Sequence, residues 1–171
     1  LFALLPLANS FAQTTPVSTT FTISANVLTQ LTVVKNVDLN FGDVFQASTQ
    51  HLNPAGTPTY TSAGGQTAAK FTITGAGSRE VTVAFTNHTS LTGSGGPLAV
   101  TYVANDASIV QGTAAPSLTS GWNPTSASAV EDLDATTGIA TVYLGGQVAP
   151  TVAMSGGFTC TGTITVVYTG N

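Results

Sequence analysis

Charged side chains are scarce in this sequence. Lysine and arginine number 3, aspartate and glutamate number 7, and charged residues make up 6% of the 171 residues, against about a quarter in ordinary globular domains. There is no basic run or stripe, so the electrostatic footprint of a nucleic-acid-binding protein is missing, and the formal net charge of −4 disfavours anionic membrane surfaces. Threonine, serine, glycine and alanine replace the charges, a composition typical of secreted β-rich proteins.

Groups that carry catalysis or bind metals are equally scarce. Cys160 is the single cysteine, so no disulfide can form within the chain, and we expect it to be a small core residue. The two histidines, His51 and His88, lie far apart in turn-like contexts that lack a nucleophile motif, and we expect both to be exposed loop residues. We therefore predict a protein that is not an enzyme and has no catalytic residues, cofactor or metal site.

Three weaker patterns each have two interpretations. The acidic residues at 131–134 are either a solvated turn or a calcium site, although their spacing falls short of an EF-hand loop. Residues 87–89 form an Asn-His-Thr glycosylation sequon, which also occurs by chance. Tyr102, Trp122 and Tyr143 are either core residues or part of a carbohydrate-binding surface.

Alternation of apolar and polar residues is the dominant pattern of the chain. Because successive side chains of a strand point to opposite faces, this alternation predicts β-strands. Stretches that qualify lie at residues 21–27, 31–33, 37–41, 69–73, 81–85, 98–102, 139–144 and 158–168. Residues 46–66 are expected to be mainly loop, and residues 105–130 are weakly patterned. About eight strands with no helical periodicity predict an all-β, antiparallel two-sheet sandwich, with a closed barrel as the alternative.

The last of these stretches is the clearest strand. Its apolar face consists of Phe158, Cys160, Gly162, Ile164, Val166 and Tyr168. Threonine residues occupy most of the other face. A strong strand near the end of a sequence needs partners on both flanks, because an unpaired edge invites association. What pairs with this strand is therefore central to the function.

The sequence begins with an apolar stretch at residues 1–12, LFALLPLANSFA. It is similar to the apolar region of a secretory signal peptide with a cleavage site after Ala12, which indicates secretion. A helix needs roughly 20 residues to span a bilayer, so we expect no membrane span from this stretch. We divide the chain into an N-terminal apolar segment and linker, residues 1–20, and a β-sandwich domain, residues 21–171.

Several motifs together resemble a known family. The stretches FTISANV at 21–27, VDLNFG at 37–42, AAKFTITG at 68–75 and GTITVVY at 162–168 follow one another in the order seen in a family of secreted bacterial β-sandwich proteins. That family is similar to spore coat protein U and to the Csu-type pilins of chaperone–usher pili. The resemblance covers residues 21–171, with Tyr168 at the position of a tyrosine near the terminus of such pilins.

The resemblance implies an incomplete immunoglobulin-like sandwich whose missing strand is donated by a neighbouring subunit. The acceptor groove would be lined by Phe21, Ile23, Phe158, Cys160, Ile164, Val166 and Tyr168. The donor strand predicted from alternation within the apolar stretch has the face Leu1, Ala3, Leu5, Leu7 and Phe11. If the chain is cleaved after Ala12, the donor would be residues 13–20, whose face is weaker. In a third interpretation, residues 1–12 are only a signal-peptide remnant.

These features predict a pilin-like structural subunit of an extracellular or cell-surface filament. Its partners would be copies of itself, arranged head to tail in a helical homopolymer, because a heterologous contact that does not close forms an open array. An assembly chaperone is a further candidate partner. The alternative is a monomeric secreted or surface-attached module that acts as an adhesin or binds glycans.

Overall fold

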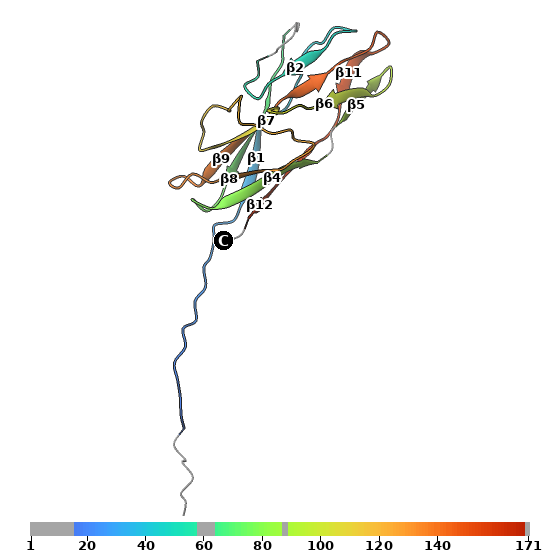
Figure 1. Ribbon diagram of the computed structural model, residues 1–171. Helices are drawn as coiled ribbons and strands as arrows, with labels where there is room; N and C mark the ends of the chain where they lie inside the picture. Colours follow the sequence, from blue (N-terminus) through green and yellow to red (C-terminus); the bar gives the residue numbers. More distant parts are fainter. Residues whose placement is uncertain (1–15, 58–63, 87–88, 170–171) are drawn as a thin grey trace, which may run out of the picture.

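The computed structural model describes residues 16–57, 64–86 and 89–169 of the chain. Within these residues, twelve strands form antiparallel sheets and no helix occurs. The strands are β1 (Thr32–Val37), β2 (Gln50–Leu52), β3 (Ala69–Thr74), β4 (Glu80–Thr86), β5 (Ser90–Ser94), β6 (Leu98–Thr101), β7 (Ala107–Gln111), β8 (Ala129–Asp132), β9 (Ile139–Leu144), β10 (Gly146–Val148), β11 (Ser155–Thr159) and β12 (Thr163–Tyr168) (Figure 1). The all-β prediction is confirmed, with more and shorter strands than the alternation indicates.

The first layer is a sheet with the strand order β1-β3-β9-β7. Its central pair, β3 and β9, sets Ile73 opposite Ala140, and both side chains are fully buried. On the other side of β3, Ile73 lies opposite Val33 of β1, which is exposed. Strand β1 pairs only with β3 and is therefore an edge of this sheet.

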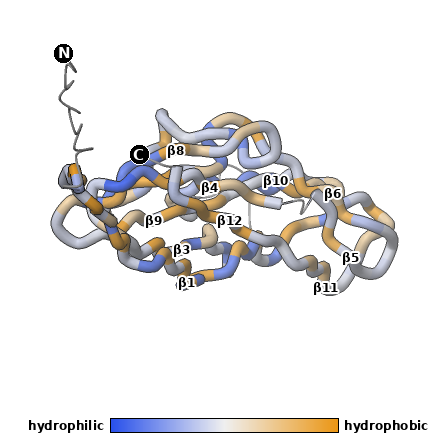
Figure 2. The backbone as a smooth tube through the Cα atoms, turned by 90° about the horizontal axis from the view of Figure 1, so that it is seen from below, coloured by the Kyte–Doolittle hydropathy of each residue, from blue (hydrophilic) through white to orange (hydrophobic). Residues whose placement is uncertain are grey.

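The second layer is built from two sheets that continue one another along the chain. One has the order β12-β4-β8, and the other has the order β11-β5-β6-β10-β2. Only residues 160–162 separate β11 from β12, so these two strands form a nearly continuous edge beside β4 and β5. Figure 2 shows the β1–β3 side and the β4–β8 side of the domain as separate layers, which is the arrangement of a β-sandwich.

The core between the layers consists of two clusters. We call the first the closed cluster; its buried members are Ile73, Val81, Val83, Leu133, Ala140 and Val142. The second, which we call the open cluster, has the buried members Phe41, Leu52, Ala69, Leu98, Val100, Tyr102, Ala107, Leu144 and Val148. Phe71, Phe85 and Trp122 pack against both clusters, and the ring of Phe85 stacks on Trp122 with centroids 6.3 Å apart. The clusters are therefore two parts of one core.

Residues 16–31 precede the first strand and form what we call the tail. Figure 1 shows it running away from the domain near the C-terminal end of β12. The strand predicted at residues 21–27 is not formed, and Phe21, Ile23 and Val27 are 81%, 82% and 92% exposed. The alternation that predicted a strand is present, but no segment of the described residues pairs with it.

Other boundaries also differ from the predictions. Within the stretch expected to be strand at 37–41, Val37 is the last residue of β1, and of residues 38–41 only Asn40 forms a bridge, to Thr67. The single terminal strand expected at 158–168 is divided, because residues 160–162 leave the ladder between β11 and β12. The expected loop at 46–66 contains β2, and the weakly patterned region at 105–130 contains β7 and the start of β8.

Candidate functional site

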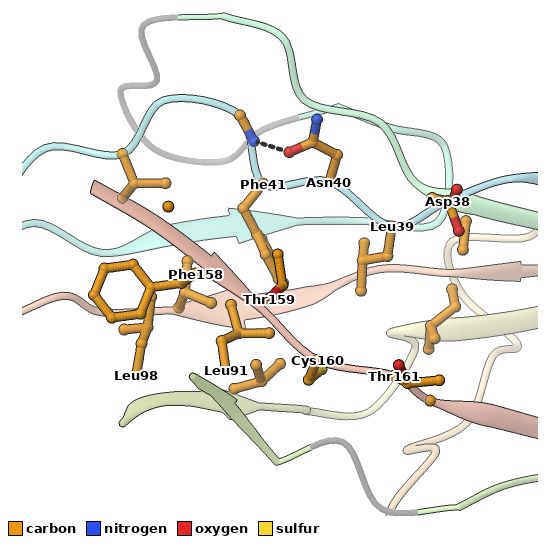
Figure 3. Close-up of a pocket in the computed structure, with 18 of the residues that line it drawn as sticks. Asp38, Leu39, Asn40, Phe41, Leu91, Leu98, Phe158, Thr159, Cys160 and Thr161 are labelled. Atoms are coloured by element: carbon orange, nitrogen blue, oxygen red, sulfur yellow. Dashed lines mark hydrogen bonds between the residues drawn. The ribbon is translucent and has the colours of Figure 1, made fainter. Parts of the chain in front are cut away.

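An open groove of about 1110 Å³ lies between the two layers of the sandwich. One wall is formed by residues 38–44, which follow β1, and the opposite wall by residues 154–164, which include β11 and lead into β12 (Figure 3). Both walls continue edge strands, because β1, β11 and β12 each lie at one edge of their sheet. The groove is therefore the place where the two layers of the sandwich do not meet.

The groove lies over the open cluster of the core, and the partly buried side chains that pack against this cluster line it. Its floor and walls are mainly apolar side chains from both layers: Leu39, Phe41, Val44, Phe71, Phe85, Leu91, Leu98, Val100, Leu144, Val148, Met154, Phe158 and Ile164. In Figure 3, Leu91, Leu98 and Phe158 lie close together at one end of the groove, and Leu39 and Phe41 extend into it from the facing wall. Apolar side chains from both layers therefore meet in one open groove.

The charged residues that line the groove, Lys35, Asp38 and Asp43, are exposed and lie at its rim. Burial, followed by the nearby Cys160 and Asp106, raises the pKa of the Tyr102 hydroxyl, which therefore stays protonated at neutral pH. Partial desolvation by the neighbouring wall residues also raises the pKa of the Cys160 thiol. At the rim, the ammonium group of Lys35 lies 2.6 Å from the Asp38 carboxylate, so these two charges compensate each other. Such a groove suits an uncharged, apolar occupant.

Three of the residues predicted to form the acceptor groove do line it, namely Phe158, Cys160 and Ile164. Cys160 is an exposed residue of the open wall rather than an enclosed core residue. Val166 and Tyr168 lie beyond the end of the groove, where they pack against the closed cluster.

The other predicted site residues lie elsewhere. Phe21 and Ile23 were expected in the groove wall, but the structure places them in the exposed tail. The predicted donor face, residues 1–11, lies outside the described residues. Of the alternative donor at 13–20, residues 13–15 lie outside them, and residues 16–20 belong to the exposed tail.

The sequence analysis missed much of the groove because it could not identify neighbouring strands. Leu91 of β5 and Met154 before β11 were not singled out, although both contact the open cluster. The Leu-Asn-Phe-Gly motif at residues 39–42 was recognised as part of the resemblance, and it forms the wall opposite Phe158. For that wall, the motif was the one available signal.

His51 is not the exposed loop residue that we expected. It belongs to β2, and its Nε2 atom lies 2.7 Å from Oδ1 of Asp106, whose side chain is only 2% exposed. The second oxygen of Asp106 accepts a hydrogen bond from the backbone N–H of Val103 at 2.7 Å. This pair ties β2 to the connection between β6 and β7. His88 lies outside the described residues.

Two of the three weaker patterns of the sequence can be located in the structure. Within the described residues, no group of three or more histidine, cysteine, aspartate or glutamate side chains could hold a metal ion. The acidic stretch contributes to β8, and Asp134 caps a turn by accepting hydrogen bonds from Thr136 and Thr137. Two residues of the sequon lie outside the described residues.

The aromatic residues considered for sugar binding do not share a surface. Trp122 packs into the core, Tyr102 faces the groove, and Tyr143 lies under the ammonium group of Lys70, 5.6 Å from its ring centroid. In the part of the chain that the structure describes, there is also no helix long and apolar enough to cross a membrane.

No protein-family model, no curated protein and no solved structure matches the chain. The groove and the tail therefore provide the basis for a functional proposal.

Proposed function

We propose that this chain is the structural subunit of an extracellular filament, in which an extended segment of one copy fills the groove of the next. The observation that carries this proposal is the groove itself, which leaves partly buried apolar side chains next to the open cluster, among them Leu39, Leu91 and Phe158, accessible between two sheet edges. Adding a strand there would pair with both edges, cover the core and complete an immunoglobulin-like sandwich.

The groove has the length of a single strand. All eleven residues from 154 to 164 line one wall. At about 3.3 Å per residue, an extended segment of the same number of residues spans about 36 Å. Its backbone can pair with the edge at β11, while alternate side chains enter the groove.

The tail provides a donor of this length. In residues 17–27 the positions Val17, Phe21, Ile23 and Val27 lie on one face of an extended strand, and their side chains are 81–92% exposed. Thr19 and Ala25 occupy the remaining positions of that face. We therefore assign the donor strand to residues 17–27 of the tail, in place of residues 1–12.

The chemistry of the tail matches that of the groove. Residues 16–31 contain no charged side chain, as suits a groove whose charged residues lie at its rim. Burying each large apolar side chain of the donor contributes about 1.5–3 kcal/mol. Since the tail leaves one molecule and the groove belongs to another, the contact is heterologous and continues into an open array. The resemblance to pilins and the signal-like residues 1–12 support an extracellular location.

Electron microscopy of the purified full chain tests the proposal. We expect fibres, and we expect the double variant Phe21→Ser/Ile23→Ser to remain monomeric while its urea unfolding curve stays unchanged, because both side chains are exposed in the free subunit. The matched control Thr22→Ser/Ser24→Thr alters the other face of the tail and should still form fibres. A full chain that stays monomeric at high concentration would contradict the proposal and favour a monomeric binding module.

A further inference from the structure

Tyr168 connects three parts of the chain at the root of the tail. Its hydroxyl accepts a hydrogen bond from the backbone N–H of Ala76 at 2.7 Å and donates one to the carbonyl oxygen of Thr29 at 2.8 Å. Gly75 provides the room for this contact, because a Cβ atom there would overlap the Tyr168 hydroxyl and crowd Leu31. We call the hydrogen-bonded group of Tyr168, Thr29 and Ala76 the latch.

The latch lies at the end of the sandwich where the two layers are closed. Leu31, Ile164, Val166 and Tyr168 all pack against the closed cluster there. The lining of the groove begins only at Lys35 on one side and Ile164 on the other. Four residues of β-strand, about 13 Å, therefore separate the root of the tail from the beginning of its own groove.

The groove of the tail's own domain is an alternative binding site for the tail, and it competes with the groove of a second copy. Two sites joined by a short flexible linker see each other at an effective concentration in the millimolar range. A neighbouring subunit in dilute solution offers a far lower concentration. Unless the geometry opposes it, insertion within the chain would therefore precede polymerisation.

The geometry of the tail root opposes insertion within the chain in two ways. Folding back requires a turn within residues 28–31, and the latch holds Thr29 while Leu31 is packed against the core. The returning strand would then have to pass the closed end alongside β1 before it reached Lys35. That passage takes about four residues, so Ala25 and Val27 would stay outside the groove.

We infer that the latch keeps the tail out of its own groove and thereby commits it to the groove of a second copy. This inference rests on the proposed function, and it assigns Tyr168 a positioning role that is separate from covering the core. In this arrangement, Tyr168 determines whether the donor strand inserts into the groove of its own chain or into the groove of a second copy.

Chemical crosslinking from the tail to Cys160 distinguishes the two destinations. Thr19→Cys places a thiol on the apolar face of the tail, and a short bismaleimide can join it to Cys160 in the groove wall. Exchange between copies yields crosslinked dimers and longer ladders, whereas insertion within the chain yields a crosslinked monomer. With the latch intact, we expect ladders to predominate at micromolar concentration.

Tyr168→Phe in the Thr19→Cys chain removes both hydrogen bonds of the latch and keeps the ring. We expect the ratio of ladder to crosslinked monomer to fall about tenfold, the effect of roughly one net hydrogen bond. The matched control is Tyr143→Phe, which removes an exposed tyrosine hydroxyl that donates to the Ala114 carbonyl oxygen at 3.0 Å. An unchanged ratio in Tyr168→Phe relative to this control would overturn the inference.

A second variant keeps the test decisive if Tyr168→Phe fails to fold. Leu28→Asn/Thr29→Gly introduces the sequence preferred for a two-residue hairpin turn and leaves Tyr168 in place. It should also shift the product towards crosslinked monomer, and ladders at the unaltered ratio would contradict the inference. If neither product formed in any variant, the proposed function would fail and the inference with it. If ladders formed in the same ratio to crosslinked monomer with and without the latch, the inference would be contradicted and the proposed function would still be supported.

Discussion

The carboxylate of Asp106 holds the imidazole of His51 across 55 positions of sequence, with Oδ1 and Nε2 2.7 Å apart. The same carboxylate also binds the backbone N–H of Val103, and its side chain is 2% exposed. His51 belongs to β2 of the second layer, and Asp106 lies in the connection from β6 of that layer to β7 of the first. This pair is therefore a structural support for the open half of the sandwich.

Removing this carboxylate should destabilise the domain. In Asp106→Ala the Val103 N–H and the His51 ring lose their buried partner, so we expect the free energy of unfolding to fall by about 3 kcal/mol. Urea unfolding of the full chain measures it. The control Asp38→Ala breaks an ion pair whose side chains are 57% and 74% exposed, and it should cost about 0.5 kcal/mol or less. Similar losses in the two variants would contradict the role of Asp106.

The wall opposite Phe158 depends on the backbone of Gly42. Its φ angle is +70°, and a Cβ atom at this position would overlap the carbonyl oxygen of Gly64. We expect Gly42→Ala to lower the free energy of unfolding by more than the 1–2 kcal/mol or so that a left-handed conformation alone costs. Gly96→Ala is the control, because φ there is +103° but no atom lies within 4 Å of the added Cβ. If Gly42→Ala cost no more than Gly96→Ala, the close contact would not matter.

The reactivity of Cys160 should report whether the groove is filled. Partial desolvation raises the pKa of this thiol, so at pH 8 its reactive thiolate fraction is smaller than that of a free cysteine. Alkylation of monomers should therefore be slower than alkylation of the urea-unfolded chain, and its rate should still increase above pH 9. In fibres the donor strand covers the wall, and we expect the rate to fall at least about tenfold. Equal rates in monomers and fibres would show that Cys160 stays uncovered.

A peptide with the sequence of residues 16–28 should occupy the groove of the monomer and inhibit fibre growth. At about 100 times its Kd it should stabilise the monomer by about 2.7 kcal/mol, seen as a higher unfolding midpoint. Because the peptide carries no charged side chain, its Kd should hardly change between about 0.05 and about 0.5 M salt. The matched peptide with serine at positions 21 and 23 should neither bind nor inhibit, and inhibition by both peptides would contradict a specific donor face.

The sequence was informative where a strand is long and is paired within the chain. Alternation located β3, β4 and β9 because these strands have six, seven and six residues, which is enough to establish a period. Strands β2 and β10 have three residues each, which is too few to establish a period. In β2 the buried residue that precedes Leu52 on the same face is Gln50, a polar side chain that obscures the pattern.

The tail illustrates a different limit. Alternation at residues 21–27 indicates a strand with one apolar face, but it does not say which molecule covers that face. The prediction placed Phe21 and Ile23 within their own sandwich, and the structure leaves both side chains exposed. The groove was only partly predictable for the same reason, since which strands become neighbours depends on the topology of the sheets. Phe158, Cys160 and Ile164 could be found because they lie on a single strand-like stretch.

The division of the core into a closed and an open cluster has a consequence for what happens when such a filament breaks. In a filament of the proposed kind, every interior subunit has a covered groove, and one uncovered groove remains at one end of each fibre. The amount of exposed core then depends on the number of fibre ends and not on the mass of polymer. Shearing a fibre would multiply these ends, so breakage would seed further growth and adhesion, whereas long intact fibres would be nearly inert.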